Sequence, residues 1–298
     1  MKRNKIAKIN GASAATARFG LGMLTPTMVV LLVMTAYPLI FTFVYSFTDY
    51  NYLKGTEDAS FVLFENYASL IQNGYFQQAV WNTVIFTVLA VVLEMGFGLL
   101  IAVFVNSLKR GQKIMRTLLL LPYLLPAVTV ALSWRMMLSA NYGIINQFLE
   151  SLGLPVFNWF MDTQTAFGTI LVIDVWQNVP FVFLLLYASL QSVSESQYEA
   201  ARIDGAGTLQ QFWYITLPNI KSSLALCALL RTIDTFRLFE KVNVLTGGGP
   251  AGTTTTITQF LYNYGIKPLD FGFGSAGAIV MTILVLILSS FYIKRAMG

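Results

Sequence analysis

Long apolar stretches dominate this chain and decide what it can fold into. The longest, Phe19 to Thr48, runs for 30 residues without a charged side chain. A helix of about 20 residues already crosses a hydrocarbon layer, and the stretch is too long for the core of a cleaved signal peptide. Further stretches of this kind occur at 80–106, 117–134, 166–190, 222–245 and 271–293. We therefore expect an all-α membrane protein with six transmembrane helices.

The stretch at 222–245 is the weakest of the six, because it is interrupted by Arg231, Asp234, Arg237, Glu240 and Lys241. The distribution of basic residues supports keeping it as a span. With the amino terminus inside the cell, 13 Lys and Arg residues flank the spans on the cytoplasmic side, and only Lys54 and Lys267 lie outside. This bias follows the positive-inside rule. We expect both termini in the cytoplasm, with 1–18 as a cytoplasmic amino-terminal segment and 19–298 as one transmembrane domain.

The composition argues against an enzyme. The 298 residues include no histidine, which is the commonest general base and metal ligand, and a single cysteine, Cys227. We therefore expect no catalytic residue, no metal site and no internal disulfide. The net charge of +5 does not indicate nucleic-acid binding, because the basic residues follow the predicted membrane sides and do not cluster into one face.

The predicted cytoplasmic loop at 191–221 is too polar for lipid and too patterned for a plain connector. Ser196 and Glu199 have the spacing of a capping box, which predicts that a short helix begins there. Gly205 and Gly207 tolerate left-handed backbone angles and can end that helix. A second amphipathic piece, 208–217, is expected to stop at Pro218. The residues alone leave open whether this is an ordinary surface helix or a docking element for another protein.

The run Glu199-Ala-Ala-Arg-Ile-Asp-Gly-Ala206, continued by Phe212, Ile215, Leu217 and Pro218, resembles the EAA loop of bacterial ABC-importer permeases. In that family the loop forms a coupling helix that docks in a groove of the ATPase subunit. One departure is Ser222, where the family often has a second proline. The resemblance implies a coupling role for Glu199, Ala200, Ala201, Asp204, Gly205, Ala206 and Pro218.

A second stretch, Leu245-Thr-Gly-Gly-Gly-Pro-Ala-Gly-Thr-Thr254, resembles the segment after the fifth span of maltose-type sugar permeases, and Asn66-Tyr67 and Asn82-Thr83 fit as well. Its glycines match G-x-G-x-x-G, but no predicted strand precedes them, so we interpret them as a tight external turn and not as a nucleotide site.

The resemblance implies a type I ABC importer permease fold, spanning the bacterial cytoplasmic membrane several times and surrounded by lipid. It also implies the partners. These are a second permease of different sequence, an ATPase dimer that binds ATP and Mg²⁺, and an extracytoplasmic solute-binding protein that delivers a sugar or sugar derivative. No cofactor is then expected in this chain itself, and no nucleic-acid partner.

Polar residues inside the predicted spans are costly and therefore informative. Asp174, Gln177, Asn178 and Phe181 share one helical face. Such a face suits a sugar, whose hydroxyls need mixed donors and acceptors and whose ring stacks on an aromatic side chain. It equally suits a polar seam between two helices, and the residues leave both interpretations open.

Charged residues of the fifth predicted span alternate in sign at steps of three, which permits ion pairs along the helix. The resemblance implies that Asp234 and Arg237 lie in the substrate path together with Asp174, Gln177, Asn178 and Phe181. Charge at Asp234 and Arg237 suggests an acidic or amino sugar as a hypothesis. Glu94 has no partner that the sequence identifies, and a helix-packing role is favoured for it.

The main alternative is a secondary transporter driven by an ion gradient, for which the intramembrane carboxylates Glu94, Asp174 and Asp234 are the argument. Such carriers commonly contain inverted repeats and broken helices, and the sequence displays neither clearly. A membrane enzyme lacks a base to activate a serine or Cys227.

Overall fold

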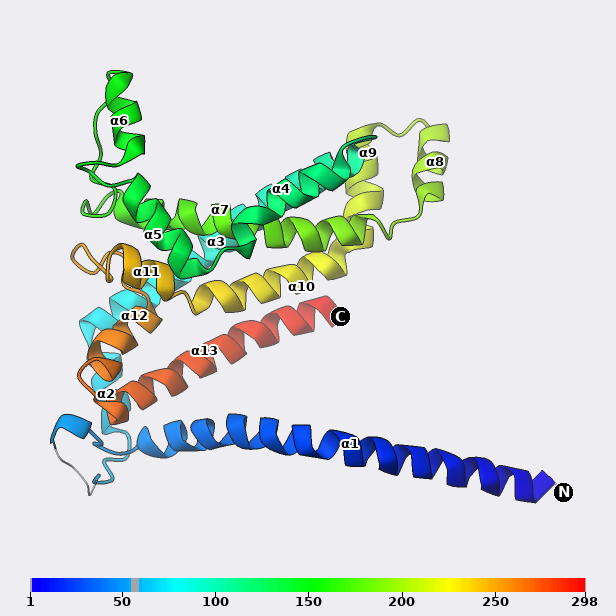
Figure 1. The fold of residues 1–298 in the computed structure, drawn as a ribbon, viewed down its shortest axis with the longest axis horizontal. Helices are drawn as coiled ribbons and strands as arrows, with labels where there is room; N and C mark the ends of the chain where they lie inside the picture. The colour runs from blue at the N-terminus through cyan, green and yellow to red at the C-terminus, as the bar shows by residue number, and fades with distance from the viewer. Residues whose placement is uncertain (1, 55–58, 298) are drawn as a thin grey trace.

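The computed structural model describes residues 2–54 and 59–297, and within these residues the chain is helical with no β-strand beyond two isolated bridges. Figure 1 shows the helices in chain order. Their bounds are α1 Lys2–Tyr45, η1 Tyr52–Lys54, α2 Glu65–Gln72, α3 Gly74–Ser107, α4 Gln112–Leu124, α5 Ala127–Met137, α6 Ile144–Ser151, α7 Ala166–Leu190, α8 Glu195–Ile203, α9 Thr208–Gln211, η2 Phe212–Thr216, α10 Leu217–Phe236, α11 Glu240–Leu245, α12 Ile257–Leu261, η3 Tyr262–Ile266 and α13 Phe271–Met297.

Four of the predicted spans are single helices long and apolar enough to cross a membrane. They are Phe19–Tyr45 within α1, all of α3 and α7, and Phe271–Tyr292 within α13. The prediction at 166–190 coincides with α7. The helix α1 runs without a break from Lys2, so the boundary placed at residue 18 stays a prediction.

The predicted span at 117–134 is broken. It consists of α4 and α5, which meet at an angle of 90°. The break lies at Leu125 and Pro126, where Leu125 adopts an extended conformation. Proline disfavours helical angles in the residue before it and donates no hydrogen bond, so the helix ends there. The sequence pattern predicted an apolar span at 117–134 but did not reveal this break.

The predicted span at 222–245 is divided as well. Its helix α10 ends at Phe236 and α11 begins at Glu240, with Arg237 as the cap between them. Among the described residues, α10 is not one of the helices that are long and apolar enough to span by composition. The structure therefore supports four spans, or five if the bent pair counts as one.

The centre of the molecule is the contact between α3 and α7, with α10 beside them (Figure 1). A Cβ atom added at Gly98 on α3 would lie 2.5 Å from Val182 on α7, so glycine permits the close approach of the two helices. Buried residues from α3, α7 and α10, among them Val105, Phe183 and Cys227, pack together at one end of this contact. This packing fixes the polar residues of the three helices relative to one another.

The helix α1 contacts α13, and its membrane-length portion leaves its side chains exposed in the single chain. It is joined to the bundle at its carboxyl end. There the Asn66 amide donates to the carbonyls of Ser46 and Thr48, at 3.1 and 2.8 Å, and the Tyr67 hydroxyl donates to Ser46 Oγ. Asp49 accepts hydrogen bonds from the Ser60 amide and hydroxyl, which lower the pKa of its carboxyl group.

Candidate functional site

The helix α8 projects from one end of the bundle, beyond the ends of α7 and α10 (Figure 1). None of its residues is buried. Apolar side chains around it are strongly exposed, with Ile203 86% and Tyr214 81% accessible. An exposed apolar surface beside a helix that the chain leaves unpacked is typical of a protein-binding element.

The helix α8 begins at Glu195, two residues before the start that a capping box with Ser196 as its cap would give. Ser194 is its cap residue, and no side chain caps it. The hydroxyls of Ser194 and Ser196 are hydrogen-bonded to each other at 2.7 Å, so the Ser196 to Glu199 capping box does not form and that prediction was wrong.

The carboxyl end of α8 is a Schellman motif. The Gly205 amide donates to the Arg202 carbonyl at 3.2 Å, and the Ala206 amide donates to the Ala201 carbonyl at 2.8 Å. Gly205 has a φ of +79°, the left-handed conformation that glycine adopts without strain. The prediction that Gly205 ends the helix is confirmed.

Gly207 and Pro218 behave differently from the prediction. Gly207 is extended, with a φ of −69°, and its amide donates to the Gln210 side chain. The chain then continues through α9 and a π-helical turn directly into α10, so Pro218 does not stop it. The wider π turn places the Leu217 amide on the carbonyl of Phe212. Because Pro218 follows in the first turn of α10, its missing N–H interrupts no α-helical bond there.

Two hydrogen bonds connect α8 to the last residue of η2 and to the first turn of α10. The hydroxyls of Tyr198 and Thr216 are 2.9 Å apart, and the Asn219 amide donates to the Gln197 side chain at 2.8 Å. The position of the exposed helix α8 relative to the bundle is therefore fixed by side-chain contacts as well as by the connecting chain.

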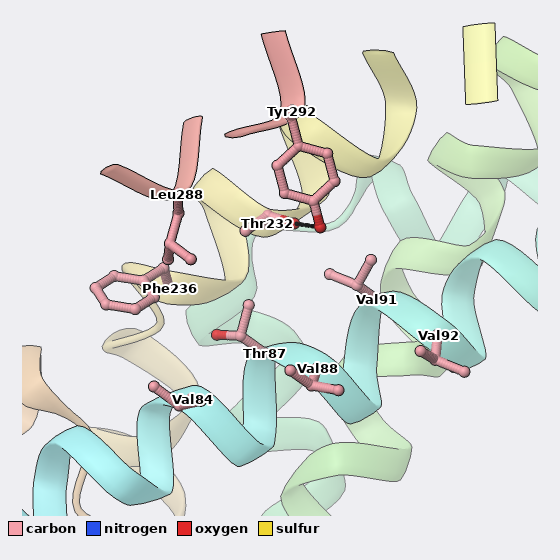
Figure 2. A pocket seen from close by; sticks show the side chains of 9 residues that line it. All are labelled: Val84, Thr87, Val88, Val91, Val92, Thr232, Phe236, Leu288 and Tyr292. Atoms are coloured by element: carbon pink, nitrogen blue, oxygen red, sulfur yellow. Dashed lines mark hydrogen bonds between the residues drawn. The ribbon is translucent and has the colours of Figure 1, made fainter. Parts of the chain in front are cut away.

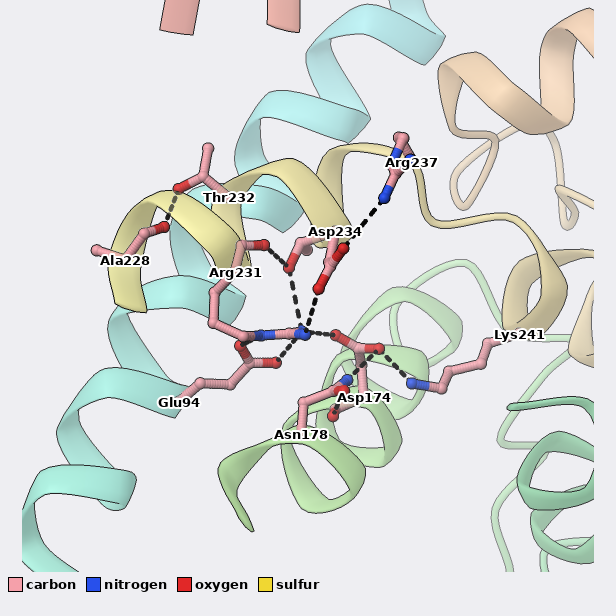
Figure 3. Close-up of polar contacts among 10 residues, drawn as sticks. Glu94, Asp174, Asn178, Ala228, Arg231, Thr232, Asp234, Arg237 and Lys241 are labelled. Atoms are coloured by element: carbon pink, nitrogen blue, oxygen red, sulfur yellow. Dashed lines mark hydrogen bonds and ion pairs between the residues drawn. The ribbon is translucent and has the colours of Figure 1, made fainter. Parts of the chain in front are cut away.

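A buried ionic cluster joins α3, α7, α10 and α11 (Figure 3). Arg231 donates to both carboxylate oxygens of Glu94, at 2.6 and 3.0 Å, and its guanidinium lies 3.9 Å from Asp174. Lys241 forms an ion pair with Asp174. All four side chains are almost fully buried. Pairing of this kind is what allows charges to exist inside an apolar bundle.

The exposed edge of this cluster is formed by Asp234 and Arg237. Asp234 lies 3.6 Å from Arg231 and 3.1 Å from Arg237. The side chains of Asp234 and Arg237 are 51% and 59% exposed. The i, i+3 pairing predicted along this segment is therefore present at two of its steps. Glu240 lies on the separate helix α11.

The four residues predicted to share a face of α7 contact three different parts of the structure. Asp174 lies in the ionic cluster, where Asn178 donates to its backbone carbonyl at 2.9 Å and its carboxylate at 3.1 Å. Gln177 donates to the Leu125 carbonyl at the α4–α5 break, at 2.8 Å. The Phe181 ring packs on Tyr123. In this single chain, Asp174 and Gln177 join neighbouring helices, as expected of a polar seam. The roles of Asp174, Gln177, Asn178 and Phe181 in a substrate path stay predictions.

Sequence reasoning missed the partners of Glu94 and Asp174. The sequence placed Arg231 in ion pairs along its own segment, and Lys241 only as an interruption of an apolar stretch. The available signal was the balance of charge, because each carboxylate in an apolar span needs a cation nearby. Which cation pairs with which acid depends on how α3, α7, α10 and α11 pack.

A cavity of about 170 Å³ lies between α3, α10 and α13 (Figure 2). Its walls are mainly apolar, including Val84, Val88, Val91 and Leu288. The Thr232 hydroxyl, near one edge, is already hydrogen-bonded to Tyr292 at 3.1 Å. The cavity lacks the convergent polar groups that a sugar site requires. Among the described residues, no group of three or more His, Cys, Asp or Glu side chains is placed to hold a metal ion.

Residues 94–296 match the family model of the binding-protein-dependent transport system inner membrane component. The chain belongs to this family. The match includes α8, α10 and every residue of the ionic cluster. The resemblance drawn from residues 199–218 is thereby confirmed at the level of the family, and the chain is a multi-pass component of the inner membrane.

Two relatives extend over nearly the whole of this inner membrane component. The trehalose/maltose transport system permease protein MalF of Thermococcus litoralis is 37% identical over 279 residues, 93% of each chain. The sulfoquinovosyl glycerol transport system permease protein SmoG of Agrobacterium fabrum is 33% identical over 272 residues, 91% of this chain and 88% of the relative.

The fold also matches a solved transporter. A chain of a bacterial ABC transporter involved in the import of the acidic polysaccharide alginate superposes with a TM-score of 0.84 over 95% of this chain and 96% of that chain, at 22% identity. The predicted all-helical ABC importer permease fold is confirmed at that level. An ion-coupled secondary transporter is not supported, because the family is defined by binding-protein-dependent transport.

Proposed function

We propose that this chain is the permease subunit of an ATP-driven importer of a sugar or sugar derivative. It forms the translocation path with a second permease of different sequence and receives substrate from an extracytoplasmic binding protein. An ATPase dimer binds ATP and Mg²⁺ and carries out hydrolysis, so this chain is not an enzyme. The sugars for which the trehalose/maltose and sulfoquinovosyl glycerol relatives are named support the sugar class.

We propose a type I arrangement with six crossings and both termini in the cytoplasm. The crossings are α1, α3, the bent pair α4 and α5, α7, α10 and α13. The arrangement of the chain supports this, because the two termini lie toward the same end of the molecule as α8 (Figure 1). Polar α10 can cross in spite of its charges, because Arg231 is buried against Glu94 and does not meet lipid.

The exposure of α8 is the observation that carries the proposal. In this mechanism α8, with Glu199, Ala200 and Ala201 in its body and Gly205 at its end, docks in a groove of the ATPase. Closure of the two ATPase subunits moves α8. The contacts of Tyr198 with Thr216 and of Gln197 with Asn219 pass this displacement to α10. The bundle then changes between inward-open and outward-open states as a two-state movement.

The substrate path is proposed to pass the exposed edge of the ionic cluster, at Asp234 and Arg237, with Asn178 and Phe181 of α7 nearby in the bundle. Asp234 and Arg237 neutralise each other at 3.1 Å. Their charges therefore do not by themselves require a charged substrate, and the two named relatives include permeases for both a neutral and a sulfonated sugar.

Reconstitution tests this function. The chain, its second permease and its ATPase are assembled in proteoliposomes, and uptake of trehalose, maltose and sulfoquinovosyl glycerol is measured with and without the binding protein. We expect uptake of a sugar that requires both ATP and the binding protein. Uptake driven by an ion gradient without ATP would refute the proposal. Ala201→Lys places a long charged side chain where small residues of α8 are proposed to let the ATPase approach closely. This variant should lose uptake while the protein remains in the membrane.

A further inference from the structure

A second hollow, of about 220 Å³, lies at the opposite end of the molecule from α8. The glycine turn at 247–252 forms one wall, the start of α3 another, and the segment from Phe260 to Tyr264 the third. Three glycines of the turn adopt left-handed angles: Gly247, Gly248 and Gly252. Residues 247–252 form a turn, as the sequence predicted, but a turn alone does not explain why it encloses a hollow.

The turn is held rigidly. The Asn82 amide donates to the carbonyls of Gly252 and Thr255, at 2.9 and 3.1 Å. The Thr255 hydroxyl donates to the Gly248 carbonyl at 2.8 Å. A Cβ atom at Gly248 would lie 2.6 Å from that hydroxyl. The walls are therefore fixed before any ligand arrives, which lowers the entropic cost of binding.

The hollow offers amide groups that the protein leaves unused. Among the described residues, the Gln78 side chain, which lies against Gly252, makes no hydrogen bond. The carbonyl oxygen of Asn263 accepts from Gln259 at 3.2 Å, and its NH₂ group has no partner in the part of the chain that the structure describes. Amides supply both donors and acceptors, which is the mixture that sugar hydroxyls need.

Aromatic rings complete the lining. Tyr264 stacks on the fully buried ring of Phe260, with centroids 4.5 Å apart and planes 25° apart. Tyr75 lies nearly parallel to Tyr264 at 6.2 Å. Because Phe260 fixes the orientation of Tyr264, the tyrosine presents a preformed aromatic surface. The volume is smaller than the roughly 300–1,000 Å³ of sites for drug-sized ligands, so it matches one sugar ring and not an extended oligosaccharide.

From this geometry we propose that the hollow is a saccharide subsite, distinct from the translocation path, which holds one sugar ring at the external mouth of the permease. Its amides at Gln78 and Asn263 bind hydroxyl groups, and Tyr264 stacks on the ring. The proposal rests on the proposed function, because the external placement of this end and the sugar class both come from it.

The test measures sugar binding directly, on the assembled complex of both permeases and ATPase in lipid nanodiscs, without binding protein. The probes are methyl glycosides of glucose, galactose, mannose, xylose, glucuronic acid and N-acetylglucosamine, detected by saturation-transfer difference NMR. We expect at least one to bind. Gln78→Leu and Tyr264→Ala should each weaken its binding tenfold or more, while Tyr264→Phe, which keeps the ring, should weaken it less than threefold. Gln72→Leu is the matched control, an exposed glutamine outside the hollow.

Three results would overturn the subsite. The first is that none of the six glycosides binds. The second is that glycoside binding survives Gln78→Leu but is lost in Asn178→Leu on α7. The third is that Gln78→Leu weakens docking of the binding protein while glycoside binding is unchanged. The last would make the hollow a protein contact. ATP-driven uptake is measured in parallel. If glycoside binding fails while ATP-driven uptake persists, only the subsite is refuted. If uptake proves independent of ATP, the proposed function is refuted instead.

Discussion

Glu94 and Arg231 are 137 positions apart in the sequence and are joined by two hydrogen bonds, at 2.6 and 3.0 Å, with both side chains buried. The pair connects α3 to α10, the helix to which α8 is attached. Arg231 also donates to the Thr235 hydroxyl at 3.3 Å. The same residue thus links the central helix contact with the helix that we propose to receive motion from the ATPase.

Removing one partner of this pair should destabilise the protein strongly. Glu94→Leu leaves the buried cluster with an uncompensated positive charge, and breaking a buried pair costs about 3–5 kcal/mol. We expect a clear fall in the thermal unfolding midpoint of the purified complex. The double variant Glu94→Leu/Arg231→Leu restores the balance between the remaining acids and bases and should recover most of the loss. A single variant as stable as the wild type would contradict this prediction.

Gly205 and Gly207 provide a matched test of the proposed coupling role of α8. Gly205→Val forces a β-branched residue to a φ of +79°, where even unbranched residues lose about 1–2 kcal/mol, and should alter the end of α8. Gly207→Ala, at a φ of −69°, should be tolerated. We expect the first variant to reach the membrane at normal levels, by immunoblot, but to lose sugar uptake and substrate-stimulated ATPase activity. Normal transport by Gly205→Val would refute the coupling role.

Two threonines one helical turn apart on α3 should respond in opposite directions to the same substitution. Buried Thr83 donates to the Ala79 carbonyl at 2.7 Å and accepts from the Ile257 amide at 2.9 Å. Thr83→Val leaves that amide unpaired and should cost about 1–3 kcal/mol. Within residues 2–54 and 59–297 the buried Thr87 hydroxyl has no hydrogen-bond partner. It adjoins the apolar cavity of Figure 2, so Thr87→Val should stabilise the protein by about 1 kcal/mol. Thermal unfolding in one detergent compares them, and equal shifts would contradict the assignment.

Neutralising Asp234 and Arg237 tests whether the substrate is charged. The two groups compensate each other, so Asp234→Asn/Arg237→Gln changes no net charge. Exposed pairs contribute about 0–1 kcal/mol, so uptake of trehalose should fall less than about fivefold. Uptake of an acidic sugar such as sulfoquinovosyl glycerol should fall tenfold or more if these residues bind its charge. An unchanged rate with the acidic sugar would count against the acidic-sugar hypothesis.

The sequence predicts the long helices well and their interruptions poorly. Hydropathy alone locates α7 at 166–190, because apolar length is a local property. Hydropathy does not reveal that the helix breaks before Pro126 within 117–134. It also does not reveal that α10 ends at Phe236, before a charged segment. Both breaks depend on backbone groups being satisfied by other helices, as Gln177 does for the Leu125 carbonyl.

Motif resemblance singled out the loop at 191–221 and the residues Asn66 and Asn82, but it did not show which groups these asparagines contact. Each side-chain amide donates hydrogen bonds to two backbone carbonyls of another segment. Asn66 contacts the segment at the end of α1, and Asn82 contacts the glycine turn. These contacts, like those of Glu94 and Lys241, join residues far apart in the chain. Local sequence patterns contain no information on such pairs, so the three-dimensional structure was needed to find them.

The ionic cluster contains three acids, Glu94, Asp174 and Asp234, and three bases, Arg231, Arg237 and Lys241. Carrying one elementary charge across a potential of 100 mV takes about 2.3 kcal/mol. With all six groups ionised their sum is zero, so moving the cluster as a unit through the bilayer would transfer no net charge. The membrane voltage would then neither assist nor oppose a movement of this cluster during the proposed transport cycle.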